Sequence, residues 1–182
     1  HSELPSERIM REGGRLHGFQ IWVNLPARDK MVPAHYQEIP KERLPSARTD
    51  DALASVRVIA GEALGARAVI ETRTPILLFD WTLEPGASVD VPVPRDFDVY
   101  AYVFEGGATV GEGTRLDEGQ LAILGGGDAV RLARPRESGS AGRLLLLGGV
   151  PLHEPVARYG PFVMNSEAEV RQAIADFRRG AF

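Results

Sequence analysis

Histidines and carboxylates must carry any acid–base or metal chemistry of this chain, because the sequence contains no cysteine. The four histidines are His1, His17, His35 and His153. His1 is followed after one residue by Glu3, and residues i and i+2 of a strand point to the same face. A neutral imidazole beside a carboxylate suits a divalent first-row metal such as Fe(II), with coordination positions left open. A two-residue pattern of this kind also arises by chance.

The other three histidines favour structural roles. His17 opens the alternating segment 16–26, where a hydrogen-bonded histidine in the core or at a strand edge is expected. Phe19 and Trp22 of the same segment are expected in the core. His35 and His153 stand in turn-like contexts without a second ligand at metal spacing, so we expect them to be surface or structural residues.

The composition is that of an ordinary globular protein and excludes several classes of partner. The 182 residues carry a net charge of −4, with 43% hydrophobic and 25% charged residues. A mild acidic excess gives no basic patch for direct nucleic-acid binding. No apolar run approaches the roughly 20 residues needed to cross a bilayer. The lack of cysteine excludes disulfides and thiolate metal sites and fits a cytoplasmic protein.

Many short apolar runs separated by turn residues predict an all-β sandwich or barrel. Glycines in 84–86, 105–107, 117–119 and 125–128 supply the turns. The expected strands are 16–25, 56–62, 66–72, 76–83, 88–93, 99–105, 120–124, 129–133 and 143–147.

One helix is expected near the end of the chain. Ser166 and Glu169 have the spacing of a capping box, and Val170, Ala173, Ile174 and Phe177 follow at helical spacing as one apolar face. Gly180 would end this helix.

Several of these segments together resemble the pirin family. The resemblance covers nearly the whole chain and is carried by residues 1–3, 16–33, 61–65, 72–75 and 160–165, of which 16–33 is the longest and most specific. Pirins are bicupins, built from two double-stranded β-helix (jelly-roll) barrels, and the first barrel binds iron. The resemblance therefore implies an all-β cupin fold with a remnant of the first barrel, a complete second barrel and a short C-terminal helix.

The family's metal ligands are three histidines and one glutamate. Two of the histidines come from an early H-x-H motif, and the third histidine and the glutamate from a later H-x-E. The resemblance assigns His1 and Glu3 to the later pair, with Glu3 as ligand or general base. The early motif does not occur in this sequence, so the resemblance implies that the N-terminal part of the first barrel is missing.

The implied division of the chain is into four parts. Residues 1–39 are the C-terminal remnant of the first, metal-type barrel, 40–55 a polar linker, 56–159 the second barrel, and 160–182 a segment and helix packing back toward the first barrel. In the general cupin pattern, histidines would stand near residues 92–94, but here the sequence is Pro-Val-Pro. Glu105 near the glutamate position has no imidazole partners, so the second barrel is expected to be metal-free.

Three functions remain open at this level. Family resemblance implies a non-haem dioxygenase that uses Fe(II) or another divalent first-row metal to open flavonols such as quercetin. It equally implies a redox-sensitive protein that binds a regulatory partner as a transcription cofactor. The third alternative is an inactive scaffold, with no metal bound in this chain.

Whichever of these functions holds, the apolar side chains of the segment 16–25 must be shielded from water. We expect Phe19, Ile21 and Val23 to be covered by a missing segment, by a second copy through self-association of exposed barrel edges, or by the terminal helix.

Overall fold

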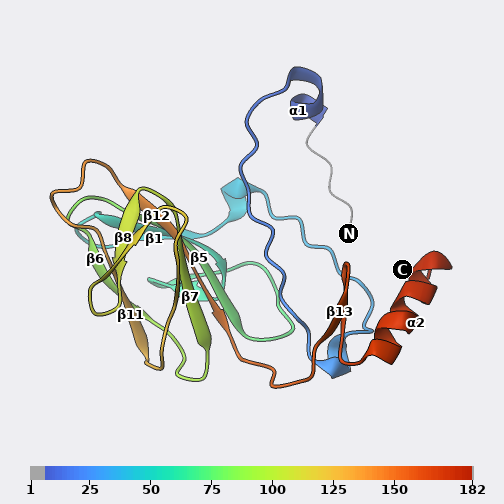
Figure 1. Ribbon diagram of the computed structural model, residues 1–182. Helices are drawn as coiled ribbons and strands as arrows, with labels where there is room; N and C mark the ends of the chain where they lie inside the picture. The colour runs from blue at the N-terminus through green and yellow to red at the C-terminus, as the bar shows by residue number, and fades with distance from the viewer. Residues whose placement is uncertain (1–6, 182) are drawn as a thin grey trace.

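The computed structural model describes residues 7–181. It is built mainly from short strands, with one helix near each end (Figure 1). In chain order the elements are α1 (Glu7–Glu12), η1 (Ala27–Asp29), η2 (Lys41–Arg43), β1 (Ser46–Arg48), β2 (Ala54–Ala60), β3 (Glu62–Ala63), β4 (Ala66–Arg67), β5 (Ile76–Leu83), β6 (Ser88–Pro92), β7 (Asp98–Glu105), β8 (Gly107–Val110), β9 (Thr114–Asp117), β10 (Leu121–Ile123), β11 (Ala129–Ala133), β12 (Gly142–Gly149), β13 (Ala157–Tyr159), β14 (Phe162–Met164) and α2 (Glu167–Arg178).

Two antiparallel sheets form the body of the molecule, on the left in Figure 1. The larger has the strand order β1-β2-β5-β12-β7-β10, and the smaller has the order β6-β11-β8-β9. Side chains from both sheets fill the space between them, so the expected all-β barrel is confirmed. β3–β4 and β13–β14 are separate two-stranded hairpins.

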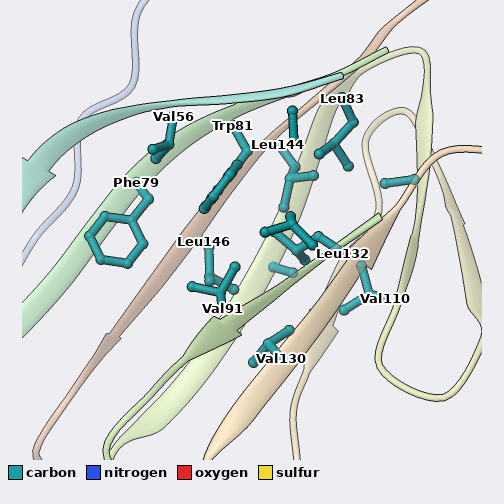
Figure 2. Close-up of a cluster of buried hydrophobic side chains, with 14 of the residues drawn as sticks. Val56, Phe79, Trp81, Leu83, Val91, Val110, Val130, Leu132, Leu144 and Leu146 are labelled. Atoms are coloured by element: carbon teal, nitrogen blue, oxygen red, sulfur yellow. The ribbon is translucent and has the colours of Figure 1, made fainter. Parts of the chain in front are cut away.

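The core follows directly from the alternation of the strands. In β5, Leu77, Phe79, Trp81 and Leu83 point inward and are buried, while the residues between them are only partly buried. Figure 2 shows Phe79, Trp81 and Leu83 together with side chains of the facing sheet, such as Val91 and Leu132. Within residues 7–181, no polar or charged residue is buried. Burying one such large side chain stabilises the fold by about 1.5–3 kcal/mol. The indole Nε1 of Trp81 is buried with no hydrogen-bond partner in the described part of the chain.

The predicted strand at residues 16–25 is wrong. This stretch, the arm (residues 13–26), has no regular secondary structure and runs beside the barrel toward η1 (Figure 1). Its apolar residues contact the outer face of the larger sheet, where Ile21 and Val23 line a shallow pocket with Leu78 and Leu147. The alternation therefore reflects side-chain packing on a sheet rather than a place in its hydrogen-bonded ladder.

Several short strands were not predicted from the sequence. β8, β9, β13 and β14 are each three or four residues long, and most lie beside glycines. β1 lies in the polar stretch 40–55 and pairs with β2 at the edge of the larger sheet. By contrast, 76–83 and 129–133 are strands with the predicted bounds.

The end of the chain forms a unit of its own beside the barrel, which we call the C-terminal unit (residues 157–181). The β13–β14 hairpin packs against α2, and Phe162 meets Phe177 with ring centroids 5.9 Å apart. Figure 1 shows this unit on the far side of the arm from the two sheets. None of the helices in residues 7–181 is long and apolar enough to cross a bilayer.

The caps of α2 confirm the predicted helix. The hydroxyl of Ser166 accepts a hydrogen bond from the Glu169 N–H at 3.3 Å, while the Glu169 carboxylate accepts one from the Asn165 N–H at 3.1 Å. At the other end Gly180 has φ +72°, and the N–H of Ala181 donates to the Asp176 carbonyl at 3.0 Å. This is the arrangement of a Schellman motif, in which glycine accepts the left-handed conformation without strain.

Candidate functional site

The predicted ligands His1 and Glu3 lie outside the described residues, which start at Glu7. The other three histidines are all exposed. The segment 7–181 contains no group of three or more histidine, cysteine, aspartate or glutamate side chains that could hold a metal ion. The described part of the chain therefore supplies no metal site of its own.

The segment where the cupin pattern carries histidines follows Gly86 in this barrel. Gly86 has φ +92° and makes the turn into β6, as the pattern requires. The following side chains that point inward are Val89, Val91 and Val93, each at most 8% exposed. Glu105 lies on the outside instead, with its side chain 62% exposed and its carboxylate 3.6 Å from Arg143 Nη1. Residues 92 and 94, where the cupin pattern has histidines, are exposed prolines, and the inward side chains beside them are valines.

The arm carries a cluster of rings on the outer face of the larger sheet. Phe19 lies edge-on to Phe104 and Tyr102, with centroids 5.1 and 6.0 Å away, and His17 is 5.4 Å from Phe19. The prediction that Phe19 and Trp22 lie in the core is wrong, because they remain 44% and 49% exposed. The guanidinium of Arg158 lies over the Trp22 ring at 5.4 Å.

The expected cover over the arm is not provided by the terminal helix in this structure. Phe19, Ile21 and Val23 are all more than a third exposed, and Ile123 at the neighbouring sheet edge is 76% exposed. Exposed apolar residues that gather on one face mark an interaction surface.

Charged residues occupy the other half of the same outer face. Asp80 of β5 accepts hydrogen bonds from Arg57 Nη1 at 3.2 Å and from Arg143 Nη2 at 3.1 Å. The Asp80 side chain is only 11% exposed, whereas each arginine side chain is 35% exposed. Three strands hold this triad, and Arg143 also lies 4.7 Å from the centre of the Phe104 ring.

A second polar cluster fastens the arm to the C-terminal unit. Lys30 Nζ donates to Asn24 Oδ1 at 2.5 Å and to the Val163 carbonyl at 3.1 Å. Glu154 Oε2 accepts from the Ala27 N–H at 2.7 Å and from Asn165 Nδ2 at 3.0 Å. Two of these contacts, Lys30 to Val163 and Ala27 to Glu154, join residues more than 120 positions apart.

The electrostatics of this cluster are set by partial burial. Removal of water from the Lys30 ammonium lowers its pKa below the ordinary value of a lysine. The negative charges of Glu154 and Glu169 oppose that shift.

Sequence reasoning missed both polar clusters. Arg57, Asp80 and Arg143 belong to different strands, and only the register of those strands brings them together. One signal was available for Asp80, because an acidic residue inside the apolar run 76–83 at an outward position needs a partner.

Comparison with known proteins gives a consistent picture. The family model for the "Pirin C-terminal cupin domain" matches residues 78–182. Pirin from Homo sapiens is 38% identical over 183 residues, which covers 98% of this chain and 59% of that protein. A pirin-like protein from Solanum lycopersicum is 36% identical over 182 residues, covering 99% of this chain and 60% of its own length. The chain thus spans about three fifths of the length of these curated relatives.

A solved structure extends the likeness to three dimensions. The crystal structure of a quercetin 2,3-dioxygenase from Acinetobacter baumannii has a TM-score of 0.80 and 38% sequence identity to this chain. The match covers 88% of this chain and 55% of that one. The fold of this chain is therefore similar to that of this quercetin 2,3-dioxygenase.

Proposed function

Since this chain belongs to the pirin family, we propose that the protein it represents is a metal-dependent cupin oxygenase that opens flavonol-type rings. The observation that carries the proposal is the 38% identity and TM-score of 0.80 to the Acinetobacter protein named quercetin 2,3-dioxygenase. The relatives are longer than this chain, so the proposal concerns the full-length protein.

We assign the metal ligands to His1 and Glu3, together with an H-x-H pair that is absent from this sequence. The donor types fit Fe(II) or another divalent first-row metal. The described residues do not fit such an ion, because the barrel interior offers valines and no cluster of donors occurs in residues 7–181. The barrel of residues 56–159 therefore has a structural role in this proposal.

The same proposal gives roles to the remaining parts. Residues 1–39 belong to the metal-bearing barrel, and residues 160–182 pack back toward it. Residues 40–55 connect the two barrels and also supply the edge strand β1 of the second. The contacts of Lys30 and Glu154 support this division, since they tie the end of the arm to the C-terminal unit.

Iron analysis after anaerobic loading with Fe(II) tests the ligand assignment. In the full-length protein, His1→Ala and Glu3→Ala should each lower iron retention by an order of magnitude or more, because ligands act as a set. His153→Ala is the matched control, since His153 is exposed and outside any donor cluster in the described range. Equal iron content in all four proteins would reject the assignment.

Oxygen consumption with a flavonol tests the reaction itself. The metal-loaded protein should consume oxygen only when quercetin is present, and removal of the metal should abolish the rate. A metal-loaded protein without turnover would favour the alternative function, a redox-sensitive module that binds a regulatory protein.

One observation supports that alternative specifically. The arm and the edge strand β10 expose Phe19, Val23, Leu121 and Ile123, each between 44% and 76% exposed, on one side of the larger sheet. A protein partner or a second copy of the chain would bury these side chains. Light scattering distinguishes self-association, because a monodisperse monomer at high concentration would exclude it.

A further inference from the structure

The outer face of the larger sheet holds a polar cleft of about 690 Å³ at the end formed by β1, β2, β5 and β12. Strand register places its residues in two neighbouring rows across these strands. One row is Arg48, Ser55, Thr82 and Arg143, and the other begins with Ser46, Arg57 and Asp80. Because residues of one row point to the same face, the cleft has an ordered polar floor.

Positive charge exceeds negative charge in this cleft. Its lining includes Lys41 from η2 with Arg48, Arg57 and Arg143, against two carboxylates, Glu42 and Asp80. A concave surface lined mainly by one sign of charge concentrates ions of the opposite sign. The cleft is therefore cationic in a protein whose net charge is −4.

Asp80 holds two of the guanidinium groups in place. It accepts from Arg57 and Arg143 at 3.1–3.3 Å, and its own side chain is nearly inaccessible. Each guanidinium has five N–H donors in a planar fork, and only Nη1 of Arg57 and Nη2 of Arg143 bond to Asp80. Arg143 Nη1 also lies 3.6 Å from the Glu105 carboxylate, so the open donors are mainly those of Arg57. These donors are fixed in direction, which lowers the entropy lost on binding an anion.

The other two cations are free to bind. Lys41 and Arg48 make no ion pair or side-chain hydrogen bond within residues 7–181, and both are exposed. The hydroxyls of Ser55 and Thr82 likewise have no hydrogen-bond partner in that range. The cleft thus combines fixed donors, adjustable cations and hydroxyl groups.

We propose that this cleft binds a phosphorylated small molecule, with its phosphate oxygens held between the Arg57–Asp80–Arg143 triad and the cations of Lys41 and Arg48. Guanidinium forks match phosphate oxygens in pairs, and charge-assisted hydrogen bonds of this type are about twice as strong as neutral ones. The volume is larger than one phosphate and leaves room for an organic group. The site lies outside the barrel and does not depend on the metal chemistry proposed above.

Calorimetric titration of the 182-residue chain with inorganic pyrophosphate at low ionic strength tests this site. Saturable binding to one site is expected, and Lys41→Ala combined with Arg48→Ala should weaken it by about tenfold or more. Arg136→Ala combined with Arg178→Ala removes the same charge from two exposed arginines elsewhere that make no ion pair with any described residue, and should change affinity less than about twofold. Thermal unfolding verifies that both variants fold, and Arg48→Gln serves as a milder variant of the cleft.

Three results would overturn the proposal. A titration with pyrophosphate that does not reach saturation would show that the cleft is not a binding site. Equal weakening in the two double variants would show diffuse attraction to positive charge. If citrate bound as tightly as pyrophosphate, the cleft would not be specific for phosphate and its ligand could equally be a carboxylate.

Discussion

The two faces of the larger sheet are made by the same strands and yet differ completely. On the inner face, Phe79, Trp81, Leu144 and Leu146 are at most 1% exposed and meet only other apolar groups. On the outer face, the same strands carry the charged triad at one end and the apolar surface beneath the arm at the other. The inner face therefore stabilises the fold by removing apolar side chains from water. The contribution of the outer face depends instead on specific contacts between neighbouring side chains.

The largest expected effect comes from two neighbouring leucines of β12 on opposite faces. Leu146→Ala should lower the free energy of unfolding by about 2–5 kcal/mol, because it leaves a cavity in a fully buried core. Leu147→Ala on the half-buried outer face should cost about 1 kcal/mol. Urea denaturation of the two variants measures both values. Equal losses of unfolding free energy in the two variants would contradict the proposed difference between the inner and outer faces.

A somewhat smaller effect is expected from the charged triad. Asp80→Ala leaves two guanidinium groups side by side without their shared acceptor, and we expect a loss of about 1–3 kcal/mol. The arginines are each about a third exposed, so water moderates the loss. The control Asp128→Ala, which breaks the exposed pair with Arg95, should stay within about 0.5 kcal/mol. Chemical denaturation at low and at high salt measures the loss of unfolding free energy in both variants. A loss in Asp80→Ala as small as that in Asp128→Ala would contradict the role of Asp80.

The ring cluster of the arm should contribute less. Phe19→Ala removes two edge-on contacts, each worth about 0.5–1.5 kcal/mol when fully formed, from a residue that is 44% exposed. We therefore expect faster hydrogen exchange in residues 16–26 with little change in the barrel. Exchange that quickens equally in β5 would show that the arm and the inner face unfold as one unit.

The smallest effect is a pH dependence at the cluster that fastens the arm. The pKa of Lys30 is lowered in the folded state, so the unfolded chain binds more protons between that pKa and the ordinary value of a lysine. Stability from this group therefore rises with pH across that window. The unfolding free energy of the native chain minus that of Lys30→Met should grow as the pH rises toward 10.5, the ordinary pKa of a lysine. The corresponding difference between the native chain and Leu146→Ala should not change over the same pH range.

How much could be predicted from the sequence follows from the same comparison. The strand 76–83 was predicted with its bounds, because a run of strand-forming residues between turn signals is local in the sequence. Ser166 and Gly180 likewise marked the ends of α2, since capping acts within one turn. The arm was misread as a strand because its alternating apolar residues pack against a sheet without entering its ladder.

The outer-face triad could not be predicted in this way. Arg57, Asp80 and Arg143 meet only if β5 lies between β2 and β12 in one register, and a shift of one residue would send each side chain to the opposite face. The predicted ligands His1 and Glu3 remain a prediction, because they lie outside the described residues.

The two tryptophans differ as sharply as the two faces. Trp81 is enclosed in the core with an indole N–H that finds no acceptor in the described chain, while Trp22 lies half exposed beneath Arg158. Their emission spectra should therefore be separable, with a short-wavelength band from Trp81 and a red-shifted, iodide-quenchable band from Trp22. The chain thus carries one built-in optical reporter for its interior and another for the attachment of its arm.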